Sequence, residues 1–220
     1  MSSPTAMAAA TTRRRASVAA ELVRSGALRR AVRWEPALAG CAAAVALLVW
    51  RHDTPAPLAL LRGLSLVVVL GVLFVLDDPA ARIVEATPVA WRYRLTLRVV
   101  VALVIAGPTF LALGAVLAPA VGIGAGVGVE VATVLAIGLA GAAIAFRYWA
   151  VDEPGLATAP IVLGFVGALA LVPPRWTLIV VPGPQWPAAH VRWAGVLLAA
   201  AVLVVLASRD PAARRPGASR

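Results

Sequence analysis

The sequence predicts an all-α, polytopic membrane protein with six transmembrane helices and an interfacial helix near the N-terminus. Hydrophobic residues make up 61% of the 220 residues, and the mean hydropathy is +0.90. Soluble domains of this length normally carry fewer apolar residues. The apolar residues also occur in long blocks instead of alternating with polar ones at a helix or strand period, which is typical of multi-span proteins.

Six apolar segments are candidates for membrane-spanning helices. A span needs about 20 apolar residues, with a lower limit of about 17. The first and last segments are short, so tryptophans near their ends would extend them as interfacial anchors, and an aromatic belt explains all seven tryptophans. The stretch 176–187 contains three prolines and is expected to form an interfacial loop. The six segments are residues 36–50, 58–76, 99–118, 129–146, 156–172 and 193–207.

The N-terminal region precedes these segments and divides into two parts. Residues 1–17 are rich in Ser, Thr and Ala and are expected to be a disordered cytoplasmic tail, because no apolar core follows at the distance of a signal peptide. Residues 18–35 predict a basic, weakly amphipathic helix in the headgroup layer, and a solvated basic tail is the open alternative. The transmembrane domain then covers 36–207, followed by a cytoplasmic tail at 208–220. The apolar sector of the interfacial helix consists of Val18, Leu22, Leu28 and Val32.

The distribution of arginine predicts which side of the plasma membrane each loop faces. Six spans place both termini on one side. That side carries sixteen of the 20 basic residues, with seven in residues 1–35, four in 77–98, one in 147–155 and four after 207. Positive charge concentrates in cytoplasmic loops, so both termini and the 77–98 loop are predicted to be cytoplasmic. The arginines are interpreted as topology signals, and their spread beside apolar spans argues against nucleic-acid binding.

Several chemistries are excluded or disfavoured by composition. Every basic residue is Arg, so the chain has no Walker A lysine for ATP and no lysine for Schiff-base chemistry. Cys41 is the single cysteine, which excludes an intrachain disulfide. His52 and His190 lack evident partners for a metal site or a general base, so no enzyme activity, metal or cofactor is predicted. Abundant Ala, Gly, Val and Pro without Lys is typical of a high-GC, actinobacterial genome.

The passage between the second and third apolar segments is the one long, strongly charged loop. Asp77 or Asp78 could cap a short helix that begins with Pro79, runs to Ala86 and is closed by Pro88. Two interpretations stay open, a solvated connector and a cytoplasmic docking helix for a soluble partner. The candidate docking residues are Asp77, Asp78, Pro79, Arg82, Ile83 and Glu85.

Two charged residues lie inside predicted spans. Glu130 opens the fourth span and Arg62 lies one turn into the second, near the same membrane face. An intramembrane acid is a functional hypothesis by default. Because Glu130 lies within a turn of the outer interface, the preferred interpretation is a snorkelling, solvated glutamate. Pairing of Arg62 with Glu130, as a candidate intramembrane polar pair, is the alternative.

The chain resembles type-two ABC exporter permeases, and more closely small six-span actinobacterial ABC transporter membrane components. In those permeases a short helix ending in a small-x-Pro turn and a basic stretch lead into the third span, as residues 84–98 do here. The glutamate-rich start of the exporter loop and a large third connection are missing. Further similar motifs are Leu76-Asp77-Asp78-Pro79-Ala80-Ala81, Glu153-Pro154-Gly155-Leu156, Pro173-Pro174-Arg175-Trp176, His190-x-Arg192-Trp193 and the tail 208–214.

This resemblance implies a membrane-spanning permease subunit of an ABC transporter, expected to be an exporter. It implies a separate ATPase subunit as partner, and a homodimer or a sister permease to complete the transport unit. A non-transporting membrane scaffold or regulatory subunit is the alternative, and an intramembrane enzyme is disfavoured by the scarcity of His, Ser and paired acids.

Overall fold

The structure is a computed structural model, which describes residues 33–51, 56–77, 91–121, 124–149, 153–173 and 175–208. Within these ranges every regular element is helical, so the all-α prediction is confirmed. Each of the six apolar segments coincides with one helix. The elements are α3 (Glu35–Arg51), α4 (Pro57–Leu73) with the 3₁₀ turn η1 (Phe74–Leu76), α6 (Trp91–Val121), α7 (Gly124–Trp149), α8 (Pro154–Leu169) and α9 (Trp186–Ala207).

The described helices include four that are long and apolar enough to cross a membrane, namely Pro57–Leu76, Leu95–Leu117, Gly126–Tyr148 and Trp186–Ala207. The protein is therefore a multi-pass membrane protein in its architecture. The two remaining helices are shorter, with 17 residues in α3 and 16 in α8. At 1.5 Å per residue they reach about 26 and 24 Å, slightly less than the roughly 30 Å hydrocarbon layer.

Several helix boundaries differ from the sequence prediction. Of the predicted interfacial helix 18–35, Glu35 begins α3 and residues 33–34 are not helical, while residues 18–32, like the predicted tail 1–17, lie outside the described residues. Helices α6 and α7 extend well beyond the apolar segments 99–118 and 129–146, because polar, aromatic and Arg residues such as those of 91–98 continue a helix although they do not belong to an apolar block. Helix α8 ends three residues earlier than predicted, since Pro173 lacks an N–H group and disfavours a helical residue before it.

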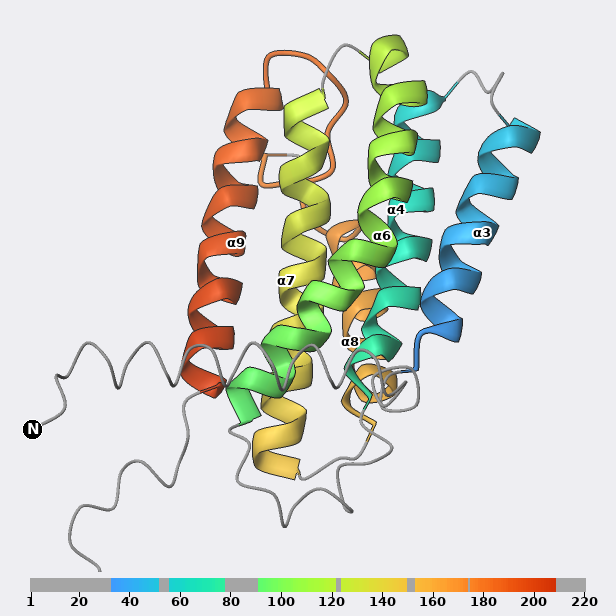
Figure 1. Ribbon diagram of the computed structural model, residues 1–220. Helices are drawn as coiled ribbons and strands as arrows, with labels where there is room; N and C mark the ends of the chain where they lie inside the picture. The colour runs from blue at the N-terminus through green and yellow to red at the C-terminus, as the bar shows by residue number, and fades with distance from the viewer. Residues whose placement is uncertain are drawn as a thin grey trace, which may run out of the picture.

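The helices run alternately up and down the bundle (Figure 1). Helix α4 packs against α3 and α7, and α7 packs against α9, which gives a row of four. Helix α6 lies against α3 and α4, while α8 lies against α7 and α4. The first residues of α3 and the last of α9 are at the same end of the bundle, called here the proximal end, and the opposite end is the distal end (Figure 1).

Close helix packing fixes the first part of the core. The Cα atom of Gly71 in α4 lies close to Gly40 in α3, so that a Cβ atom added at Gly71 would be 2.7 Å from the Pro36 carbonyl oxygen. Cys41, also in α3, is 8% exposed and belongs to the same buried cluster. Apolar side chains of α4 and α6 complete this cluster, and a second cluster joins η1, α7 and α8. The core thus connects α4 to all its neighbours.

Candidate functional site

The predicted docking loop is described at its first residue only. Asp77 follows η1 at the proximal end, and its side chain is completely buried. The other candidate docking residues, Asp78, Pro79, Arg82, Ile83 and Glu85, lie outside the described residues. The same holds for the predicted helix between Pro79 and Ala86.

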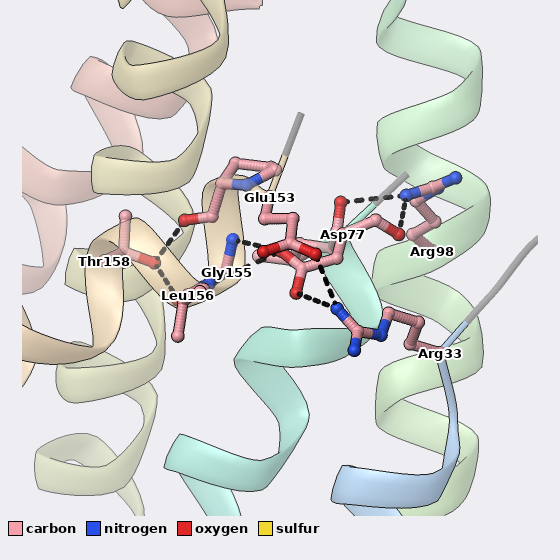
Figure 2. A network of polar contacts seen from close by, with 9 residues as sticks. Arg33, Asp77, Arg98, Glu153, Gly155, Leu156 and Thr158 are labelled. Carbon is pink, nitrogen blue, oxygen red and sulfur yellow. Dashed lines mark hydrogen bonds and ion pairs between the residues drawn. The ribbon is translucent and has the colours of Figure 1, made fainter. Parts of the chain in front are cut away.

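Asp77 caps a helix that is distant in sequence. Its Oδ1 atom accepts hydrogen bonds from the backbone N–H groups of Gly155 at 2.7 Å and Leu156 at 3.4 Å (Figure 2). These are orphan donors in the first turn of α8, and Glu153 at the N-cap position makes no capping bond of its own. The sequence analysis placed Asp77 or Asp78 at the start of a local helix. The carboxylate of Asp77 instead completes α8, 78 residues further along.

Two arginines flank Asp77 from other elements. Arg98 in α6 is 5% exposed, and its Nη1 atom donates to the backbone carbonyl groups of Leu76, at 2.8 Å, and Asp77. Arg33 donates to Glu153 Oε1 at 2.8 Å and lies 3.9 Å from Asp77 Oδ2 (Figure 2). Arg33, Asp77, Arg98 and Glu153 are called the proximal cluster. It connects η1, α6, the start of α8 and the chain before α3.

Burial raises the pKa of Asp77 above its ordinary value of 3.8, because water is excluded from the charged carboxylate. The two backbone N–H groups at the start of α8 act in the opposite direction, as does Arg33, while the charge of Glu153 adds to the increase. Asp77 Oδ2 makes no hydrogen bond within the described part of the chain. Asp77 therefore binds its proton more tightly in the folded protein than in the unfolded chain.

A close contact of Gly155 also fixes the start of α8 against the end of α4. A Cβ atom at Gly155 would lie 2.0 Å from the Leu73 carbonyl oxygen and 2.9 Å from Asp77 Oδ1. Any side chain at this position would push α8 away from the end of α4. Glycine thus allows the backbone approach that brings the first turn of α8 to the Asp77 carboxylate.

At the distal end the structure joins the two charged residues predicted inside spans. Arg62 in α4 forms a two-pronged ion pair with Glu130 in α7, from Nε to Oε2 at 2.7 Å and from Nη2 to Oε1 at 2.6 Å. Glu130 is 4% exposed, so the expected solvated, snorkelling glutamate is wrong. The pair forms because α4 and α7 pack against each other, and each charged group gains the other as a bonding partner in place of the water that it loses on burial.

His190 in α9 joins this pair from a third helix. Its Nδ1 atom is 2.8 Å from the Trp186 carbonyl oxygen, which can only accept, so Nδ1 carries a proton. The other ring nitrogen, Nε2, is 3.4 Å from Glu130 Oε1 and has no hydrogen-bond partner among the described residues. A Cβ atom at Gly126 would be 2.6 Å from this nitrogen, so glycine is needed for α7 to approach the ring. Arg62, Glu130 and His190 are called the distal cluster.

The chain between α8 and α9 folds against the distal cluster. Three of its backbone carbonyl groups accept bonds from side chains of the helices, Val180 from Arg62 Nη2 at 2.9 Å, Leu178 from Trp193 Nε1 at 2.8 Å, and Thr177 from Arg192 Nη1 at 3.0 Å. Trp193 is 2% exposed, so its assignment to an aromatic belt is wrong, whereas Trp50 and Trp176 are exposed as belt residues would be. The interpretation of arginines as topology signals is likewise incomplete, because Arg62, Arg98 and Arg192 connect separate elements.

A partly open cavity of about 180 Å³ lies beside the ion pair. Side chains of α4, α7, α8 and α9 and the segment 175–185 line it, and most of them are aliphatic. Within the described ranges, no three His, Cys, Asp or Glu side chains come together as a metal site would require. The arrangement provides an apolar compartment next to a neutralised pair of charges.

Neither cluster was predicted as a whole from the sequence. The proximal cluster unites two of the motifs that carried the resemblance, Leu76-Asp77 and Glu153-Pro154-Gly155, across 78 residues. One local signal was available, since Pro154 is typical of a first helical position whereas Glu153 before it is not a favoured N-cap residue, so the N–H groups of this turn had no evident local acceptor. Comparison with known proteins gives no match to a protein-family model, a curated protein or a solved structure.

Proposed function

We propose that this protein is the membrane-spanning permease subunit of an ABC transporter, of the exporter type, energised by a separate ATPase subunit. The resemblance of residues 84–98 and of the short motifs to type-two exporter permeases supports this assignment, together with the multi-pass helical architecture. The chain contains no lysine for a Walker A loop, so nucleotide must be bound by the partner. A second copy or a sister permease completes the transport unit.

The observation that carries the proposal is the anchoring of the charged loop at its base. The loop leaves the bundle at Asp77, whose carboxylate is bonded to the start of α8 and whose carbonyl oxygen is bonded to Arg98 of α6. A force applied to residues 78–90 therefore reaches α4, α6 and α8 through short bonds. This is what a loop that couples nucleotide hydrolysis to helix movement requires, whereas a connector that only carries topology charges needs no such base.

The proposed topology has six spans with both termini in the cytoplasm. Helices α3 and α8 would be the short crossings, and a mismatch of a few Å is accommodated by local thinning of the bilayer at modest cost. The start of α3 and the end of α9 both lie at the proximal end (Figure 1). An even number of crossings requires this arrangement. The arginine distribution makes that end cytoplasmic.

Charge reversal in the loop tests the proposal. The variants Arg82→Glu and Glu85→Arg are expected to reduce co-purification of the ATPase subunit and its stimulation by the permease. Losing a buried interface charge costs about 2–5 kcal/mol, whereas an exposed pair contributes about 0–1 kcal/mol. Arg214→Glu, a charge reversal in the C-terminal tail, is the matched control and should leave both measurements unchanged.

The outcome separates the two classes of function. Unchanged co-purification and stimulation in both loop variants would mean that the loop is only a topology signal. An ATPase that co-purifies with the wild-type chain without nucleotide-dependent transport in proteoliposomes would instead identify a regulatory or scaffold subunit.

A further inference from the structure

The cavity beside the distal cluster lies where α8 stops short. Helix α8 ends at Leu169, while its neighbours α4 and α7 continue toward the distal end. Val166 and Leu169 in the last turns of α8 line the cavity, and Ile179 of the segment 175–185 covers it from the other direction. The two prolines after α8 prevent the helix from continuing into this space. The space therefore follows from the early end of the helix.

The chemistry of the walls excludes a hydrated or strongly charged group from the aliphatic part of the cavity. Val69 of α4 and Val134 of α7 are typical of the aliphatic lining. The charges of Arg62 and Glu130 are bonded to each other, so they leave no net charge for an ion to neutralise. An ordered water molecule needs two to four polar partners, and apolar cavities of this kind stay dry or take up apolar molecules. The cavity is suited to hydrocarbon.

We propose that this cavity binds the hydrocarbon chain of a single-tailed amphiphile, whose polar head lies beside the Arg62–Glu130 pair. Its volume of about 180 Å³ exceeds the roughly 150 Å³ of an engineered cavity that takes up benzene, so it accommodates several methylene groups. The cavity is partly open, and three of the helices that line it, α4, α7 and α9, are long and apolar enough to cross a membrane, so the bilayer would be the source of an alkyl chain. The ion pair marks the polar end, because it is the one charged part of the lining.

This inference is independent of the transport proposal, because binding to the isolated chain needs no ATPase. The full-length protein in phosphatidylcholine nanodiscs is illuminated with a fatty acid that carries a photoreactive diazirine in its chain. Saturable labelling is expected at Val69, Val134 and Val166, and excess palmitate should remove it. Labelling confined to exposed residues such as Leu198 and Leu203, without saturation, would overturn the proposal.

Two variants at glycine positions distinguish binding in the cavity from general contact of the protein surface with lipid. Gly63 lines the cavity and a Cβ atom there would meet nothing within 4 Å, so the side chain in Gly63→Leu can occupy the space. Gly107 in α6 is equally open but does not line the cavity, which makes Gly107→Leu the matched control. Saturable labelling should be lost in the first variant and retained in the second. Equal saturable labelling of the two variants would contradict the proposal that the cavity is the binding site.

A second cavity-filling variant and a second photoreactive probe complete the test. Val166→Phe fills the cavity from α8 and should give the same loss if Gly63→Leu does not elute as a folded protein in size-exclusion chromatography. A photoreactive phosphatidylcholine identifies the source of the chain. Saturable labelling by the fatty acid alone supports a single-tailed amphiphile, whereas saturable labelling by both probes would show that a two-tailed bilayer lipid occupies the cavity and would overturn the proposal. Absence of saturable labelling by either probe would rule out hydrocarbon binding.

Discussion

Charged side chains inside this bundle bond to backbone groups of other elements or to each other. Arg98 is almost completely buried and binds the carbonyl groups of Leu76 and Asp77, and Arg62 binds Glu130 and the Val180 carbonyl group. Without water, an isolated charge in an apolar interior is very costly, so each must find a partner within the fold. These side chains therefore specify which helices meet.

The distal ion pair predicts a non-additive effect on stability. Glu130→Leu leaves Arg62 without its carboxylate and should destabilise the protein by about 3–5 kcal/mol, because a buried charge loses its partner. The double variant Arg62→Met/Glu130→Leu should be close to the wild type, since apolar residues of similar size fill the same space. Thermal unfolding in detergent measures both. A double variant as unstable as the single one would show that the pair is not the origin of the loss.

Asp77 predicts a specific dependence of stability on pH. Its pKa is raised by burial, so the stabilisation from its protonated form is fully present below pH 3.8 and is lost as the pH rises through the folded-state pKa. Asp77→Asn keeps an oxygen acceptor for the N–H groups of α8 and does not ionise. We expect this variant to gain stability relative to the wild type as the pH increases above 3.8.

Unfolding midpoints of both proteins, measured from acidic to neutral pH, check the expectation. A difference that stays constant across this range would contradict it. Asp77→Ala is the control for the cap alone, and losing a capping side chain typically costs about 1 kcal/mol.

At the level of elements, the start of α8 depends on its neighbours. Its first turn is capped by Asp77, and Gly155 lies directly against the end of α4. Thr158 one turn later directs its hydroxyl group to the Pro154 carbonyl oxygen at 2.9 Å, and a Cβ atom at Gly141 of α7 would touch its methyl group at 2.8 Å. The start of α8 is thus fixed in place while its end opens toward the cavity.

Glycine substitutions within α8 should therefore differ sharply. Gly155→Ala places a methyl group 2.0 Å from the Leu73 carbonyl oxygen and should destabilise the protein by about 1–3 kcal/mol through overpacking. Gly164→Ala meets nothing within 4 Å and should be neutral or stabilise the helix by up to about 1 kcal/mol. Comparison of the two unfolding midpoints tests the contact, and equal midpoints would be evidence against it.

At the level of the whole molecule, the charged clusters are located at opposite ends of the bundle. The proximal cluster fixes the base of the charged loop, and the distal cluster fixes the chain between α8 and α9. Helix α4 contributes to both, since Arg62 lies near its start and η1 with Asp77 follows its end. A movement of α4 along its axis would therefore affect both ends together.

The two ends should also face opposite sides of the membrane. Cysteines introduced at positions 85, 152 and 215 are expected to be inaccessible to a membrane-impermeant reagent in intact cells, and cysteines at 53, 124 and 185 to react. The sixteen arginines on the side of the termini provide the physical reason. The variants are built on Cys41→Ser, so that a single thiol reports each position. Labelling of residue 85 from outside would reverse the topology.

The sequence by itself determined the class of fold and the position of the helices. Blocks of apolar residues must leave water, and in a membrane the helix satisfies their backbone within one segment, so composition and length are sufficient. The sequence also identified Arg62 and Glu130 as candidate functional residues, because charged residues are rare inside apolar segments. Their pairing was left open, since local sequence does not say whether α4 and α7 are adjacent.

Only the tertiary structure decided how the polar groups are satisfied. Asp77 had two local interpretations, and the structure gave it a partner 78 residues away, because the orphan N–H groups of α8 and a buried carboxylate meet where helices cross. Trp193 moved from a predicted interface into the core for a similar reason, since the Leu178 carbonyl group offered its N–H an acceptor. The partitioning of an apolar segment into the membrane is set by its own composition and length, whereas a hydrogen bond depends on the position of a second group, which the packing of the helices determines.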